Sequence, residues 1–434
     1  MLYTKEMMRH ILSVWVGKSL LILMRIKGGG SALPGLVVER LDSAFLSRYK
    51  GGFEQVILVA GTNGKTTTTK MLRQILTGDD HKVLTNAAGS NMPRGVISAL
   101  LAHVDWLGRS EADTALLEVD EGFLGSIAED LNPDVIVVLN LLRDQLDRYG
   151  ELDRTARLIE EALPMAKYAV LNADDPRVAA LHESAAHTIW FGANKTVRAL
   201  LPHDDALHDK GNGASESLSD IHLSVEVVAT EDSKSGQTAT FRFGPSEHRL
   251  ELQISGAFNA YNAAAALAAG SILGVPTGQM LEQLYLVEPA FGRSERIKIG
   301  DKTAIMLLVK NPSGFNQIVH TYLANAPGST VLIGINDNYA DGRDVSWLWD
   351  VDIERLEDTN HTYLTTGSRA FDMALRLKYA EISAEPELST SNALKAAIDQ
   401  TEAGGTVYLV MTYTAMLDVR KKLAKHAEIG RIEI

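Results

Sequence analysis

The chain has 434 residues, enough for two or three domains of ordinary size. Its formal net charge of −13 argues against non-specific nucleic-acid binding, although it leaves room for a local basic groove. The chain contains no cysteine, which excludes disulfide bonds, thiol nucleophiles and cysteine zinc sites within it.

The apolar stretch at residues 11–24 has two interpretations. Lys18 interrupts it, and it is shorter than the about 20 residues that a transmembrane helix needs. No clear small-residue cleavage site of a signal peptide follows it. We therefore predict an N-terminal helical segment over residues 1–50 that packs on the first domain. Contact with a membrane surface is the alternative.

A phosphate-binding loop is predicted where the apolar run at residues 56–60 ends. This run indicates a buried parallel strand, and GTNGKTT follows it at 61–67 before a helical pattern. Loop N–H groups and the helix N-terminus attract phosphate in this arrangement. Lys65 is placed to reach the β- and γ-phosphates, and the Thr66 hydroxyl to help hold Mg²⁺. The alternative is a solvated turn.

Three later strands of the predicted sheet end in polar residues. Three carboxylates, Glu118, Asp120 and Glu121, lie at the end of the strand at 112–120, and ligands of open α/β sheets bind at such strand ends. These acids are therefore placed to bind Mg²⁺, with an ordinary acidic strand end as the alternative. The charged turn at 143–148 either contacts phosphate or metal, or pairs internally. The turn NADDP at 172–176 is placed to hold a nucleoside.

Beyond residue 200 the pattern changes twice. Residues 200–247 predict a polar loop and antiparallel strands, and a small-residue helix follows, with Asn259 and Asn262 at its start. These asparagines either cap the helix or contact a base edge. From residue 302, strands and helices alternate again, which predicts a second, smaller α/β domain.

Together the motifs resemble the Mur ligase family across nearly the whole chain. The resemblance rests on GTNGKTT at 61–67, the strand end at Glu118, NADDP at 172–176, GAFNAYNAAAA at 256–266 and FGRSE at 291–295. It implies an α/β fold with a Mur ligase central P-loop ATPase domain and a smaller Rossmann-like α/β C-terminal domain. We expect the central ATP-binding domain at 51–295, with a cysteine-free insertion at about 200–247, and the C-terminal domain at 296–434.

Four motifs point to one branch of the family, the synthetase subunit of a glutamine-dependent lipid II isoglutaminyl synthase. They are EVDEG at 118–122, LLRDQLDRYGE at 141–151, KNPSGFNQ at 310–317 and NDNYADGRDVSW at 336–347. The resemblance implies that ATP phosphorylates the α-carboxylate of D-glutamate in the lipid II stem peptide and that ammonia then displaces phosphate, giving D-isoglutamine. A GatD-type glutaminase in a heterodimer would supply the ammonia, since glutaminase chemistry needs a cysteine. The expected location is the cytoplasm, with a peripheral position at the inner face of the membrane as the alternative.

The resemblance also assigns residues. Lys65 and Glu118 are expected catalytic residues, Thr66 and Glu118 the Mg²⁺ ligands, and Asn262 a residue near the adenine. Asp344 is expected to complete the partner's Cys–His pair in trans, with turn capping or pairing with Arg343 as the alternative. The expected ATP-binding set is Gly61, Thr62, Asn63, Gly64, Lys65, Thr66, Thr67, Asp174, Asn262 and Arg293.

Two departures and two alternatives accompany this interpretation. Relatives often carry a four-cysteine zinc ribbon in the central domain, and its absence here predicts no zinc. Leu307 stands where relatives often have a polar residue that contacts ribose. The first alternative is a stand-alone amino-acid-adding ligase, although the short region before the phosphate loop leaves little room for a sugar-binding domain. The second is a non-catalytic nucleotide-binding scaffold for a glutaminase, which would bind ATP without releasing ADP.

Overall fold

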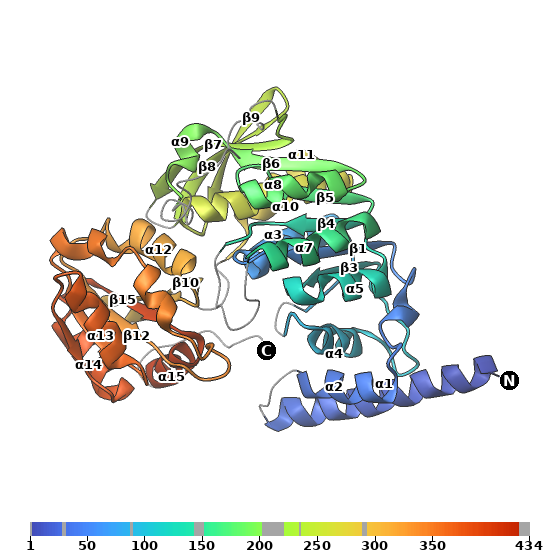
Figure 1. The fold of residues 1–434 in the computed structure, drawn as a ribbon, viewed down its shortest axis with the longest axis horizontal. Coiled ribbons are helices and arrows are strands. Elements are labelled where there is room, and N and C mark those ends of the chain that lie inside the picture. Colours follow the sequence, from blue (N-terminus) through green and yellow to red (C-terminus); the bar gives the residue numbers. More distant parts are fainter. Residues whose placement is uncertain are drawn as a thin grey trace.

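The computed structural model describes residues 2–27, 32–86, 90–142, 152–201, 221–233, 236–288 and 293–424. Its strands form two separate sheets, each covered by helices, and the two α/β units lie side by side (Figure 1). This arrangement confirms the predicted α/β fold with a second, smaller unit.

The first sheet has nine strands in the order β2-β3-β1-β4-β5-β6-β7-β8-β9. Pairing is parallel from β2 to β7 and antiparallel from β7 to β9. The β1 strand lies between β3 and β4, and its last five residues are buried, which explains its continuous apolar run. The bounds are β1 Gln55–Ala60, β2 Val83–Thr85, β3 Thr114–Glu118, β4 Val135–Val138, β5 Tyr168–Asn172, β6 Thr188–Ala193, β7 Val225–Ser233, β8 Gly236–Phe243 and β9 Ser246–Leu252.

Helices cover both faces of this sheet and give it two hydrophobic cores. One core contains α3 (Lys65–Gly78), α10 (Ala257–Ile272) and α11 (Thr277–Tyr285), and the small side chains of α10 let it approach closely. On the other face lie α4 (Pro93–His103), α5 (Leu124–Leu131), α7 (Leu152–Ala162) and α8 (Pro176–Ala180). The short α9 (Lys195–Arg198) follows β6.

The N-terminal helices α1 (Leu2–Lys27) and α2 (Ala32–Leu41) pack against α4, at the β2 end of the sheet (Figure 1). Helices α2 and α4 touch through their backbones, because a Cβ atom on Gly35 would lie 1.9 Å from the Arg94 carbonyl oxygen. Gly17 of α1 plays a similar part, since a side chain there would collide with Val38 and Leu101. The bounds of 1–50 for an N-terminal helical segment stay a prediction.

The second sheet has six strands in the order β10-β11-β15-β12-β13-β14, and only the β10–β11 pair is antiparallel. The predicted domain boundary at residues 295/296 falls inside β10, because pairing with β11 already begins at Arg293. We propose a boundary before Arg293. The bounds are β10 Arg293–Ile299, β11 Lys302–Leu308, α12 Pro312–Ile318, β12 Thr330–Gly334, β13 Thr362–Thr366, α13 Ala370–Tyr379, β14 Ala384–Pro386, α14 Thr390–Gln400, β15 Thr406–Met411 and α15 Tyr413–Leu423.

The outermost strands of the two sheets are short or charged. The edge strands β2 and β14 have three residues each, and β14 ends in a proline. The other two edges, β9 with the sequence SEHRLEL and β10 with RSERIKI, carry charged side chains along their length. Such edges resist pairing with strands of other molecules.

Candidate active site

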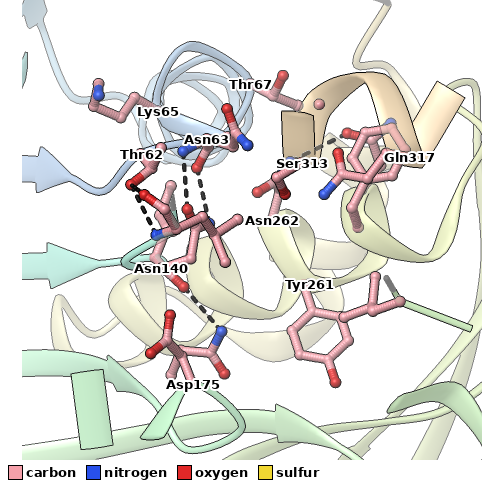
Figure 2. A pocket seen from close by; sticks show the side chains of 18 of the residues that line it. Thr62, Asn63, Lys65, Thr67, Asn140, Asp175, Tyr261, Asn262, Ser313 and Gln317 are labelled. Atoms are coloured by element: carbon pink, nitrogen blue, oxygen red, sulfur yellow. Dashed lines mark hydrogen bonds between the residues drawn. The ribbon is translucent and has the colours of Figure 1, made fainter. Parts of the chain in front are cut away.

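A cavity of about 860 Å³ lies between the two units, at the carboxyl ends of the first sheet's strands. The phosphate loop, the ends of β3 to β5 and the start of α10 form one side of it. Residues 307–322, from β11 through α12, form the other side. Figure 2 shows Ser313 and Gln317 of α12 across the cavity from Tyr261. Its size is typical of a small-molecule site.

The phosphate loop takes the backbone conformation that its glycines permit. Gly61 and Gly64 have positive φ angles of 131° and 90°, which side chains rarely adopt. Asn140, directly after β4, holds the loop by two hydrogen bonds to the Asn63 backbone (Figure 2). Its carboxamide oxygen accepts from the Asn63 N–H at 2.9 Å, and its nitrogen donates to the Asn63 carbonyl at 3.0 Å. These two bonds fix the backbone of the loop at Asn63.

Lys65, the lysine of this loop, forms a buried ion pair with Glu121. The Nζ atom lies 2.8 Å from Glu121 Oε1 and 2.6 Å from the Gly61 carbonyl oxygen. The same carboxylate oxygen accepts from the Gly61 N–H at 2.9 Å. Burial alone would lower the pKa of Lys65, but the nearby carboxylates outweigh it and raise that pKa. Burial would likewise raise the pKa of Glu121, yet the charge of Lys65 holds it below its usual value. Both groups are therefore charged at neutral pH.

The two predicted Mg²⁺ ligands are neighbours. The Thr66 hydroxyl donates to Glu118 Oε2 at 2.8 Å, and the Asn86 carboxamide fixes the backbone of Glu118. One carboxylate and one hydroxyl suit Mg²⁺, which usually completes its octahedron with phosphate oxygens and water. Within the described parts of the chain, no group of three or more His, Cys, Asp or Glu side chains could hold a metal ion. A cation here would therefore need phosphate oxygens or water as further ligands.

Two more predicted ATP-binding residues line the cavity but already have protein partners. Asp174 accepts hydrogen bonds from the Tyr261 hydroxyl at 2.7 Å and from the Ala193 N–H at 2.6 Å, and pairs with Arg198. Burial raises the pKa of Asp174 despite these partners. Asn262 lies against the phosphate loop, because a Cβ atom on Gly64 would be 2.2 Å from its Oδ1. Its expected approach to the adenine stays a prediction.

The second α/β unit contacts the phosphate loop directly. Lys310 Nζ donates to the Thr62 carbonyl at 3.2 Å, and the Asn311 carboxamide donates to the Asn63 side-chain oxygen at 3.1 Å. Asn311 also caps α12 by accepting from the Gly314 N–H at 2.8 Å. One asparagine thus begins a helix of one unit and contacts the nucleotide loop of the other. Leu307 is buried and lines the same cavity, so this position offers no polar side chain.

Asp344 lies apart from the residues that line the cavity. Its carboxylate accepts from the Ser346 N–H at 2.8 Å and the Ser346 hydroxyl at 3.0 Å, which is the turn-capping role of the alternative interpretation. Arg343 lies over the ring of Tyr339, 5.2 Å from its centroid. Tyr339 is 85% exposed, and the exposed Trp349 and Tyr379 stack edge to face at 5.2 Å on the same unit.

Some predictions fall outside the described residues. They are the charged turn at 143–148, the side chain of Arg293 and the middle of the cysteine-free insertion, residues 202–220. Conversely, the structure shows contacts that the sequence did not predict. Glu121, which was expected among the acids placed for Mg²⁺, pairs with Lys65, and the phosphate loop is contacted by Asn140, Lys310 and Asn311. Their signal in the sequence is position, since each directly follows a predicted strand.

Comparison with known proteins agrees with this architecture. Residues 59–270 match the family model of the Mur ligase middle domain, and residues 308–416 match the MurT ligase C-terminal model. The fold resembles MurF from Acinetobacter baumannii (TM-score 0.67, 20% identity, 89% of this chain and 80% of that one). It also resembles MurF from Thermotoga maritima in complex with ADP (TM-score 0.65, 18% identity, 89% and 84%).

Curated relatives cover nearly the full chain. A lipid II isoglutaminyl synthase (glutamine-hydrolyzing) subunit MurT from Streptococcus pneumoniae is 30% identical over 96% of this chain and 97% of its own length. The MurT subunit from Staphylococcus aureus is 27% identical over 93% and 94%. A UDP-N-acetylmuramoylalanine–D-glutamate ligase from Paraburkholderia phymatum is 32% identical, but over only 54% and 46%.

Fold, phosphate loop and family models together define the class of protein as a ligase of the Mur family. The C-terminal family model and the full-length relatives identify one family within this class. The chain belongs to the MurT family.

Proposed function

We propose that the chain is the synthetase subunit of a lipid II isoglutaminyl synthase. It would use ATP to convert the α-carboxylate of D-glutamate to the amide of D-isoglutamine. The full-length similarity to proteins of that name and the nucleotide-sized cavity support this proposal. The predicted site residues are part of it: the loop residues 61–67 and Asn262 would hold ATP, with Lys65 and Glu118 acting on the phosphates. We also propose that the protein acts in the cytoplasm, peripheral to the membrane.

In the first step, a carboxylate oxygen of the D-glutamate would attack the γ-phosphorus of ATP, and ADP would leave. Lys65 would exchange the Glu121 carboxylate for phosphate oxygens, since both are anions within reach of one buried ammonium group. Thr66 and Glu118 would hold Mg²⁺, which neutralises the charge of the transferring phosphoryl group. Asn140 would keep the loop N–H groups in place throughout.

In the second step, ammonia would attack the acyl carbon, inorganic phosphate would leave with the bonding electrons, and the nitrogen would lose a proton. The chain has no cysteine, so hydrolysis of glutamine by a cysteine nucleophile needs a partner chain. A GatD-type glutaminase would supply it.

We propose that this chain carries out the ligase reaction and that the partner hydrolyses glutamine. The observation that supports this assignment is the location of Asp344 away from the residues that line the cavity. A carboxylate there would have no part in phosphoryl transfer, but it is accessible to a partner. The exposed Tyr339 and Trp349 lie on the same unit, and large aromatic side chains are typical of binding surfaces. We therefore propose that Asp344 orients the catalytic histidine of the glutaminase.

The test uses the chain co-expressed with a GatD-type glutaminase and supplied with lipid II, ATP, Mg²⁺ and glutamine. Mass spectrometry would follow conversion of the carboxylate to the amide. We expect Asp344→Asn to lose amidation with glutamine and to keep it with ammonium chloride. Asp358→Asn, a change of an exposed carboxylate in the same unit, is the control and should leave both activities unchanged.

Other outcomes point elsewhere. Loss of amidation that ammonium does not restore would place Asp344 in the ligase reaction or in folding. If wild type yields no amide, the proposed reaction is wrong. ADP release without glutamine or partner would then favour a stand-alone ligase, and ATP binding without ADP release would favour a scaffold.

A further inference from the structure

Helix α1 presents an apolar stripe to solvent along its length. Seven of its large apolar side chains are between 46% and 78% exposed: Met7, Met8, Leu12, Trp15, Ile22, Leu23 and Ile26. With 3.6 residues per turn, all of them except Met7 lie within an arc of about 100° on one side of the helix. At 1.5 Å per residue, the 26 residues of α1 form a helix about 39 Å long.

The opposite side of α1 is fixed to the protein. Val14 is fully buried, and Gly17 lies so close to α2 and α4 that a Cβ atom would be 2.6 Å from Val38. Lys18 Nζ donates to the carbonyls of Leu101 and Val104 at the end of α4. The helix therefore has one buried side and one apolar exposed side, which is unusual for a helix whose partners are all in the same chain.

By length and composition α1 could cross a membrane, since residues 5–26 pass that test. The contacts of its inner side argue for a different geometry. A helix held by α2 and α4 through its residues 6–18 cannot enter a bilayer end-on without breaking those contacts. It can lie parallel to the surface, with the apolar stripe at the depth of the headgroups and the first methylene groups.

The charge of α1 is opposite to that of the protein. The helix contains five basic residues and one acidic residue, whereas the chain carries a net charge of −13. By helical geometry Arg9 and Arg25 lie on either side of the apolar stripe, and both are exposed. The acidic residue, Glu6, faces the protein side, where it lies 3.9 Å from Arg48. A basic margin around an apolar stripe matches a surface of anionic phospholipids.

Aromatic residues complete the pattern. Trp15 packs edge to face on Trp106 with ring centroids 5.8 Å apart, and its indole N–H donates to the Trp106 carbonyl at 2.9 Å. Trp15 belongs to the stripe, and both tryptophans are about half exposed. Tryptophan is enriched at the level of lipid headgroups, because its ring combines a large apolar area with one polar group.

We propose that the exposed side of α1, together with Trp106, binds the surface of a membrane that contains anionic phospholipids. The inference rests on α1 alone and does not depend on the reaction proposed above. It would fix the orientation of the protein on the bilayer, with the nine-stranded sheet above α2 and α4 (Figure 1).

The test is co-sedimentation of the full chain with vesicles of phosphatidylglycerol and phosphatidylcholine, or of phosphatidylcholine alone, at low and high salt. We expect binding to the anionic vesicles, weakened by salt. The double variant L12E/I22E should lower the partition coefficient at least about tenfold, because it places two charges in the apolar stripe. Arg25→Gln should lower binding to anionic vesicles about fivefold and leave binding to neutral vesicles unchanged.

The matched control is Leu388→Glu, which changes an exposed leucine of the second unit and should bind like wild type. Thermal unfolding of each variant would verify that it is folded. Equal sedimentation of wild type and L12E/I22E, or no sedimentation of wild type, would overturn the proposal. A dimer in solution that L12E/I22E dissociates would also overturn it, since the stripe would then be covered by a second copy.

Discussion

The ion pair between Lys65 and Glu121 makes a quantitative prediction. Replacement of Glu121 by alanine leaves a lysine that is 7% exposed without its counter-charge, and the Gly61 N–H without its acceptor. Removing one member of a buried pair typically costs about 3–5 kcal/mol. We expect a loss of that size in the free energy of unfolding without nucleotide. Glu121→Gln, which keeps an acceptor for Gly61, should lose less.

Nucleotide should change this result, because phosphate oxygens would replace the missing carboxylate beside Lys65. Urea unfolding with and without ATP and Mg²⁺ would measure it, and nucleotide should stabilise Glu121→Ala more than wild type. Glu129→Ala, an exposed glutamate of α5, is the control and should change stability by less than about 0.5 kcal/mol. A loss below about 1 kcal/mol for Glu121→Ala would contradict the energetic argument. Equal stabilisation of wild type and variant by nucleotide would contradict the proposed exchange of partners.

The pH dependence of this pair follows from its two pKa shifts. The pKa of Glu121 is lowered in the folded protein, so its contribution is complete above its ordinary value of 4.5 and is lost as the pH falls below it. The pKa of Lys65 is raised, so its contribution is lost only as the pH rises beyond its ordinary value of 10.5. Between these limits the difference between wild type and Glu121→Ala should stay constant.

Three further predictions concern stability and the site. His361 accepts from the Ser329 N–H at 3.1 Å and contacts the Leu323 carbonyl at 2.9 Å, and burial lowers its pKa. Its contribution should therefore fall as the pH drops below 6.5, so that His361→Gln costs about 1–2 kcal/mol at pH 7.5 and less at pH 5 in urea unfolding. A cost independent of pH would exclude this explanation. Gly35→Ala should lower the free energy of unfolding by about 2–3 kcal/mol, because a backbone carbonyl of α4 occupies the position of the new Cβ atom. Gly278→Ala, where this position is open, is the control and should leave thermal unfolding unchanged. Asn311→Asp keeps the acceptor that caps α12 but removes the donor to the phosphate loop, so the KM for ATP should rise about two- to tenfold. An unchanged KM would show that this contact does not affect nucleotide binding.

Much of the site was predictable because its signals are local. The phosphate loop needs a strand, two glycines, a lysine and a helix within fifteen residues, and each of these leaves a mark in the sequence. The Thr66–Glu118 contact followed from one rule, that ligands gather at the carboxyl ends of parallel strands. The α/β fold followed from the alternation of buried runs and helical patterns.

The missed contacts depend on geometry that local patterns do not contain. Glu121 faces Lys65 because a 3₁₀ turn, Glu121–Phe123, redirects the chain directly after β3, and Asp120 caps that turn. Asn311 meets Asn63 across 248 residues of sequence, and only the packing of the two units brings them together. The start of β10 is hidden for a related reason: in the sequence Arg293 resembles part of a linker, and only its pairing with β11 shows that a strand begins there.

The edges of the two sheets determine how other chains can attach to this protein. Three-residue strands, a proline and rows of charged side chains leave little free main chain for an additional strand to pair with. A partner would therefore recognise side chains and surface shape, and its affinity would depend on a few aromatic or charged anchors. Such an interface can be weakened by single substitutions without disturbing either sheet. The same edges would also protect the chain from self-aggregation during its synthesis, before any partner is present.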